Sequence, residues 1–143
     1  MEVRDAVEAD ADALAGIADA PADVMRNLIH DRTVVVAVTG SAETDPNVDV
    51  DDETTADDLL GFVSYDARDS TVHVTQLAGT RDACERLLAE PVRFAANESM
   101  DVQLLVPADE EDVREAAERV GFERLGAGPR FEGRRTVRYR LRP

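Results

Sequence analysis

The sequence contains no lysine and no tryptophan, and aromatic residues make up only 4% of it. All 16 basic residues are therefore arginines, set against 31 aspartates and glutamates, and the net charge is -15. A surface dense in carboxylates stays hydrated in concentrated salt, where apolar association strengthens and large apolar side chains become unfavourable. We therefore expect a halophilic type of protein, adapted to a salt-rich cytoplasm. An acidic protein from a low-salt cell is the alternative.

The sequence also has a single cysteine, Cys84, and no long apolar run. One thiol cannot form an intramolecular disulfide, and no Cys/His cluster is present to hold zinc. No stretch approaches the ~20 apolar residues that span a bilayer, and the acidic start is unlike a signal peptide. We expect a cytoplasmic protein with no metal site and no membrane partner, and the abundant acid disfavours nucleic acid.

The length of 143 residues fits one domain, residues 1–143. Hydrophobic periodicity predicts an alternating series of strands and helices. Strands are expected at 2–6, 33–39, 59–66, 71–77, 101–106, 123–125 and 136–142. Helices are expected at 7–18, at 21–30, from about 81, and from a cap at Asp109 to a stop at Gly121.

Residues 40–58 are acidic and nearly free of large apolar side chains, so we expect a mobile hairpin insertion there. Asp45, Asn47 and Asp49 have the alternating spacing of a calcium loop. Val50 and Ala56, however, occupy the positions that need glycine and a bidentate acid. A solvated acidic loop is therefore the interpretation we adopt.

Two segments carry a family resemblance. VRDAVEADADAL is similar to an R-x-A-x-x-x-D start, and AAERVGFERLG resembles an A-x-x-x-Y-x-x-x-G-F turn from helix to strand. With the order of the elements, they resemble the GNAT (GCN5-related N-acetyltransferase) family. The resemblance implies an α/β (α+β) fold, with a mixed, mostly antiparallel central sheet and helices on both faces. It also implies transfer of an acetyl group from acetyl-coenzyme A to a small-molecule or peptide amine, by direct attack.

The family's pyrophosphate loop, Q/R-x-x-G-x-G/A, matches this chain in spacing alone. The cofactor-binding residues that the resemblance implies are Gly79, Thr80, Arg81, Asp82, Ala83 and Cys84, with the backbone of Val74 and Gln76 for the pantetheine arm. Arg81 could meet a phosphate, whereas Asp82 places a carboxylate where the anion should lie and opposes coenzyme A binding. Asp82 is also suited to cap the helix, which is the structural alternative.

Catalytic residues are less clearly marked. Ala117 stands where the family carries a proton-donating tyrosine, which leaves Tyr65, Tyr139 or a water as substitutes. His73, on the fourth expected strand, is the candidate general base, with a purely structural role as the alternative. A degenerate GNAT-fold module that binds or regulates without catalysis therefore remains the alternative function.

Residues 130–142 hold six arginines against one glutamate, a sharp contrast in an acidic chain. One interpretation is a docking strip for a phosphate-bearing ligand, because the guanidinium fork matches phosphate oxygens. The other is a strand whose arginines pair with acids of this chain or of a second subunit. A homodimer is thus one of the open alternatives.

Overall fold

The computed structural model describes residues 2–18, 20–38, 59–130 and 133–143. The expected insertion at 40–58, with the calcium-like spacing inside it, lies outside the described residues. The strands are β1 (Glu2–Asp5), β2 (Thr33–Val38), β3 (Leu59–Arg68), β4 (Thr71–Gly79), β5 (Asp101–Pro107), β6 (Glu123–Ala127) and β7 (Thr136–Leu141). The helices are the 3-10 turn η1 (Glu8–Asp10) and the α-helices α1 (Ala11–Ala18), α2 (Ala22–Asp31), α4 (Arg81–Glu98) and α5 (Glu111–Val120).

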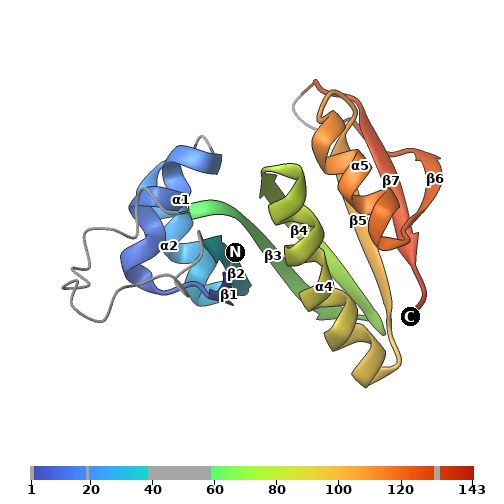
Figure 1. The fold of residues 1–143 in the computed structure, drawn as a ribbon, viewed down its shortest axis with the longest axis horizontal. Helices are drawn as coiled ribbons and strands as arrows, with labels where there is room; N and C mark the ends of the chain where they lie inside the picture. Colours follow the sequence, from blue (N-terminus) through green and yellow to red (C-terminus); the bar gives the residue numbers. More distant parts are fainter. Residues whose placement is uncertain (1, 19, 39–58, 131–132) are drawn as a thin grey trace.

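The strands form one seven-stranded sheet in the order β1-β2-β3-β4-β5-β7-β6. Every neighbouring pair is antiparallel except β4 and β5, which run parallel and are joined by α4. Figure 1 shows α4 and α5 in front of the sheet, while α1 and α2 lie at its β1 end. The mixed, mostly antiparallel sheet that the family resemblance implies is confirmed.

Helices cover both faces of the sheet, because the strand β2 is apolar on both sides. Val34 and Val36 belong to a core with Leu14 of α1 and Met25 of α2. Val35 and Ala37 face a larger core on the other side, which includes Leu87 and Leu88 of α4 and Val113 of α5. The continuous β-branched run of β2 predicts a strand that is buried on both faces, and the structure confirms it.

The hairpin between β3 and β4 is tighter than the sequence indicates. Each strand is two residues longer than expected, and the turn is reduced to Asp69 and Ser70. Both have positive φ angles, 54° and 61°, which is the conformation of a two-residue turn that matches the strand twist.

The start and end of α5 differ in how well they were predicted. Gly121 ends the helix with a φ of 116°, and its amide donates to the carbonyls of Ala117 and Glu118, as expected. The predicted cap at Asp109 is wrong, because α5 begins at Glu111 after the N-cap residue Glu110. Asp109 instead accepts a hydrogen bond from Arg134 at 2.6 Å, which ties the start of α5 to the loop before β7.

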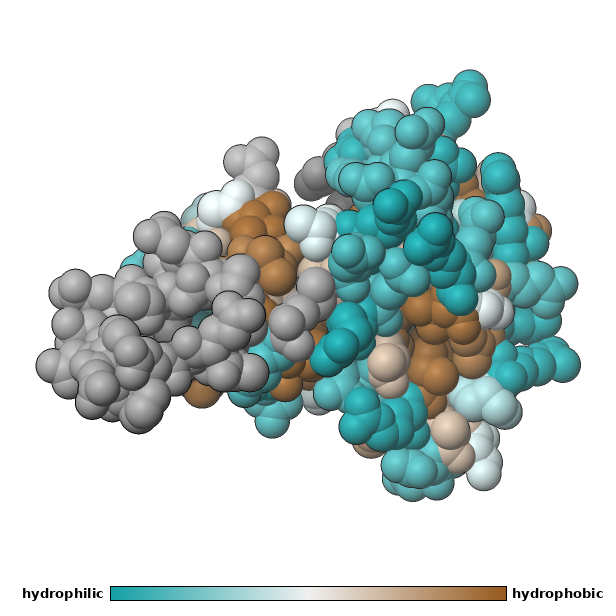
Figure 2. Space-filling model, viewed as in Figure 1, coloured by the Kyte–Doolittle hydropathy of each residue, from teal (hydrophilic) through white to brown (hydrophobic). Residues whose placement is uncertain are grey.

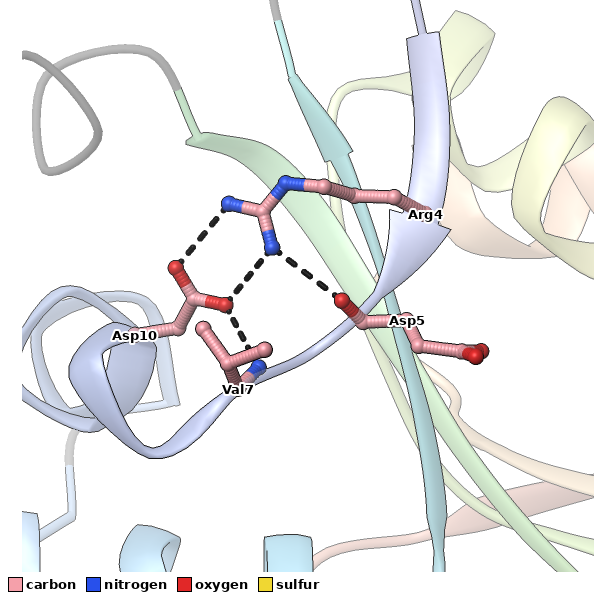
Figure 3. A network of polar contacts seen from close by, with 4 residues as sticks. All are labelled: Arg4, Asp5, Val7 and Asp10. Atoms are coloured by element: carbon pink, nitrogen blue, oxygen red, sulfur yellow. Dashed lines mark hydrogen bonds and ion pairs between the residues drawn. The ribbon is translucent and has the colours of Figure 1, made fainter. Parts of the chain in front are cut away.

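An ion pair between Arg4 and the buried carboxylate of Asp10 ties β1 to the first helical turn (Figure 3). Arg4 donates from both terminal nitrogens to Asp10, at 2.8 and 3.0 Å, and the amide of Val7 donates to the same carboxylate at 2.8 Å. The Asp10 side chain is only 1% exposed. Burial alone would raise the pKa of Asp10, but the hydrogen bonds from Arg4 and Val7 outweigh it and hold that pKa below its usual value. Arg4 and Asp10 are the arginine and aspartate of the opening motif.

None of the described helices is long and apolar enough to cross a membrane.

Candidate active site

The sheet opens between β4 and β5. Their parallel pairing begins at Thr71 with Asp101 and stops at Val74 with Leu104, yet β4 continues to Gly79 and β5 to Pro107. Beyond that point each strand pairs only with its outer neighbour, β3 or β7. Figure 1 shows the two strands separating, with the start of α4 on one side and α5 on the other. The inner edge of β4 at 75–79 therefore offers backbone groups that β5 does not use.

A β-bulge lies where this free edge begins. In the pairing with β3, Ser64 faces Gln76 and Tyr65 faces Val74, so Thr75 is the additional residue on β4. The Oγ atoms of Ser64 and Thr75 are 2.6 Å apart, which fixes the bulge to the neighbouring strand. Thr75 and Gln76 are exposed, and Val74 is buried. A bulge turns backbone groups out of the ladder, so the predicted Gln76 backbone contact falls on an accessible segment.

Gly79 holds the start of α4 close to β3. It has a φ of 135°, and a Cβ atom there would lie 2.4 Å from the Leu60 carbonyl oxygen and 2.6 Å from the Gly61 Cα. A Cβ atom on Gly61 would meet the Ala78 carbonyl oxygen at 2.5 Å. The two strands can approach this closely only because both positions are glycine.

Thr80, not Asp82, caps α4, so the structural alternative for Asp82 is wrong. The Thr80 Oγ1 accepts a hydrogen bond from the Ala83 amide at 3.1 Å, and the Thr80 carbonyl accepts one from Cys84 at 2.9 Å. Asp82 lies exposed in the first turn. The amides of Arg81 and Asp82 are in the part of a helix that has no acceptor of its own, and these two remain available to an anion.

Between the start of α4 and α5 lies a shallow hollow of about 400 Å³, lined by Arg81, Glu115, Glu118 and Arg119. Arg81 donates to Glu115 at 2.7 Å, and this hydrogen bond raises the pKa of Arg81. The guanidinium predicted to meet a phosphate is therefore already held by a carboxylate. In Figure 2 hydrophilic residues gather over α5 on this face.

Cys84 is fully buried, and its Sγ lies 3.8 Å from the Gly79 carbonyl oxygen. Burial, reinforced by nearby acids of α5, raises the pKa of Cys84 from 9.0 to about 12. The thiol therefore has no role as a nucleophile, and any contact of Cys84 with a cofactor would come from its backbone.

We expect the Cys84 thiol of the native protein to resist a disulfide reagent at pH 8. The raised pKa alone lowers the thiolate fraction about 1,000-fold relative to a thiol of pKa 9.0, and burial slows access further. The measurement is the labelling rate in buffer and in guanidinium chloride, where unfolding should restore a normal rate. Labelling of native protein at the rate of a free thiol would contradict the buried position.

His73 lies in the paired part of β4, between Asp66 of β3 and Gln103 of β5 in the register. It is partly exposed, and its neighbours Val72 and Val74 face the core under α4. Because side chains alternate along a strand, the imidazole lies on the opposite face. His73 and the start of α4 therefore lie on opposite faces of the sheet. Along β4, His73 comes just before the point where the opening begins.

The tyrosines differ in their distance from the opening. Tyr139 on β7 pairs with Leu104, the last β5 residue that pairs with β4, and its hydroxyl donates to Glu118 at 2.9 Å. Burial and this hydrogen bond raise the pKa of Tyr139. Tyr65 packs instead against Phe94 in the later turns of α4, with ring centroids 6.2 Å apart. Ala117 is fully buried, so the helix position of the family's tyrosine faces the core.

The sequence interpretation missed the contribution of α5. Glu115, Glu118 and Arg119 come 30 or more residues after the predicted loop, and only the packing of α5 beside α4 brings them to Arg81. The acids at 111, 115 and 118 recur at helical spacing, which indicates one charged helix face but not what that face meets.

No protein-family model and no curated protein matches this sequence. Solved structures match over nearly the whole chain. Ribosomal-protein-alanine N-acetyltransferase from Brucella melitensis has a TM-score of 0.72 at 15% identity, covering 100% of both chains. Arabidopsis thaliana NAA60 in complex with acetyl-CoA has a TM-score of 0.69 at 17% identity, covering 99% of this chain and 97% of that one. A protein of the GNAT family from Desulfovibrio desulfuricans has a TM-score of 0.66 at 19% identity, covering 99% of this chain and 98% of that one.

The fold is therefore that of the GNAT acetyltransferases, as the sequence resemblance implied. At these identities the likeness establishes the fold alone.

Proposed function

We propose that this protein is an N-acyltransferase that moves an acetyl group from acetyl-coenzyme A to an amine. The observation that carries the proposal is the opening between β4 and β5, with the free β4 edge at 75–79 (Figure 1). Acetyl-coenzyme A supplies an acyl thioester on an amide-containing arm. A free strand edge suits such an arm, because its amide groups pair with backbone groups of any side-chain identity.

The reaction forms a bond between the amine nitrogen and the acetyl carbon and breaks the bond from that carbon to sulfur. The amine loses one proton and the departing thiolate gains one. His73 is the proposed acceptor of the amine proton, since it lies on β4 just before the opening. Tyr139 is better placed than Tyr65 to supply the second proton, because it lies one strand from the opening on the α5 side.

Specific contacts favour the second candidate, a non-catalytic GNAT-fold module. Asp82 adds a carboxylate to the turn that would receive a phosphate, and Glu115 occupies the Arg81 guanidinium. Glu118 lines the same hollow and adds to the negative charge. A phosphate that binds to the Arg81 guanidinium would have to compete with Glu115. The strength of acetyl-coenzyme A binding therefore decides between the two functions.

We expect Asp82→Asn to bind acetyl-coenzyme A about tenfold more tightly than the native chain. Two unit charges about 4 Å apart near a protein surface interact by on the order of 1–4 kcal/mol, so removing a carboxylate beside a phosphate has an effect of this size. The measurement is a calorimetric titration with acetyl-coenzyme A at fixed ionic strength. Glu98→Gln, at the other end of α4, removes the same charge as a matched control.

Micromolar binding by the native chain that tightens in Asp82→Asn and not in Glu98→Gln would support the acyltransferase. Absence of binding by the native chain, with binding gained in Asp82→Asn, would support the non-catalytic module. Absence of binding in all three chains would remove acetyl-coenzyme A from the function altogether.

A further inference from the structure

A row of polar residues crosses the sheet on the face opposite α4 and α5. The register places one residue from each of five adjacent strands in line. They are Asp66 of β3, His73 of β4, Gln103 of β5, Arg140 of β7 and Glu123 of β6. Paired residues of neighbouring strands have their side chains on the same face of the sheet. Because His73 faces away from the core under α4, all five side chains of the row lie on that opposite face.

Two arginines on this face lack a carboxylate partner. Arg138 is exposed and Arg140 is partly exposed, and neither forms an ion pair or side-chain hydrogen bond with any described residue. Elsewhere on the C-terminal segment Arg134 reaches Asp109 at 2.6 Å. In a chain with 31 acids and 16 arginines, two neighbouring cations without an acid are unexpected. The nearest acid in the register is Glu123, opposite Arg140.

The unpaired cations lie beside the opening. Arg138 pairs with Leu105, which is the first β5 residue beyond the last β4 partner, Leu104. Leu105 is 46% exposed, although its neighbours Leu104 and Val106 are buried. Leu105 thus borders the opening on the side that α4 and α5 leave uncovered, and the two cations lie one strand away on β7.

If the thioester enters the opening from the α4 side, the amine must approach from the uncovered face of the sheet. We infer that the acceptor carries a carboxylate, which Arg138 and Arg140 bind while its amine points toward His73 and the opening. Guanidinium groups bind carboxylates with directed, charge-assisted hydrogen bonds. Leu105 contacts the aliphatic part of the acceptor. The inference rests on the proposed acetyl transfer and adds the substrate class, an amino acid or an acidic peptide.

The test compares matched amines. L-Leucine is set against L-leucinamide, and Ala-Asp-Ala amide against Ala-Asn-Ala amide, with coenzyme A release as one readout and NMR titration without acetyl-coenzyme A as the other. We expect a preference of tenfold or more for the carboxylate member of at least one pair. The first pair reports a free amino acid as acceptor and the second an acidic peptide.

Arg138→Gln and Arg140→Gln should each raise the KM for the carboxylate amine about tenfold with little change in kcat, and both should reduce the preference. Arg93→Gln, which removes one positive charge from α4, is the matched control and should leave the preference intact. Loss of preference in that control as well would mean that overall charge, not this face, attracts the acceptor.

Equal binding and equal turnover of both members of each pair would overturn the inference, while coenzyme A release would still support the acyltransferase. Carboxylate binding lost in Arg138→Gln, without any binding of acetyl-coenzyme A, would retain the anion site and reject the acyltransferase. A dimer in the native chain that Arg138→Gln dissociates would assign these cations to a second copy and overturn the inference.

Discussion

Replacing Arg4 by methionine should destabilise the protein by about 3 kcal/mol at pH 7, because it leaves the buried Asp10 carboxylate without its cation. The Arg4 side chain is 31% exposed, which places the effect at the lower end for a broken buried pair. The effect should be read as the difference in unfolding free energy between native and variant chains in urea.

The difference should depend on pH with a defined sign. The folded-state pKa of Asp10 is lowered by its hydrogen bonds, so its contribution to stability is present above the unfolded value of 3.8. That contribution is lost as the pH falls through the folded value. In Arg4→Met burial dominates and raises the pKa of Asp10. The gap between native and variant chains should therefore be large at pH 7 and shrink as the pH falls, first through the raised pKa of Asp10 in the variant and then through its lowered pKa in the native chain.

Arg26→Met is the matched control. Arg26 pairs with Asp23 at 3.2 Å and with Glu8 at 3.5 Å, but both carboxylates are well exposed. Its loss should cost less than about 0.5 kcal/mol. The double variant Arg4→Met/Asp10→Asn should recover part of the stability, since it removes the buried charge. Equal effects of Arg4→Met and Arg26→Met would show that the Asp10 carboxylate does not depend on Arg4.

Gly79→Ala should cost about 3 kcal/mol or more. The added methyl group overlaps the Leu60 carbonyl oxygen at 2.4 Å and the Gly61 Cα at 2.6 Å, and both are backbone atoms that cannot rotate away. The φ of 135° adds strain for any residue with a Cβ atom. Chemical denaturation followed by circular dichroism gives the change in unfolding free energy.

Two other glycines separate the effect of steric overlap from the effect of backbone strain. Gly126 has a φ of 124° but open space around its Cα, so Gly126→Ala should cost about 1 kcal/mol from strain alone. Gly16 lies exposed within α1 with open space, and Gly16→Ala should stabilise by up to about 1 kcal/mol. A cost at Gly79 no larger than that at Gly126 would contradict the close approach of β3 and β4.

The element types were predictable because they depend on local patterns. The valines of β2, the helical spacing of Val113, Ala116 and Ala117, and the stop at Gly121 all follow from periodicity and glycine conformation. In β7 the buried Val137 and Tyr139 alternate with the arginines at 138 and 140, which is a pattern visible in the sequence. Each of these features can be predicted from neighbouring residues in the sequence, without knowing which elements pack against them.

Features that depend on tertiary contact were not predictable. The sequence suggests Asp82 as a cap for α4, whereas Thr80 caps the helix, because the place where Gly79 meets β3 fixes where α4 begins. The insertion of β7 between β5 and β6 also has no local signal. The Glu115 contact that holds Arg81 joins residues 34 positions apart. The sequence therefore places the turn between a strand and a helix near residues 79–81, but not the charges around it.

The short pairing between β4 and β5 has a mechanical consequence. Four residue pairs join these strands, against eight between β3 and β4 and six between β5 and β7. Across the same line the exposed pairs Arg81–Glu115 and Arg119–Glu85 connect α4 to α5, and salt weakens such contacts. Under load the centre of the sheet should part along this line before it parts at β3–β4 or β5–β7, with less resistance as ionic strength rises. The two halves of the domain are thus coupled less tightly at the opening than the strands on either side of it.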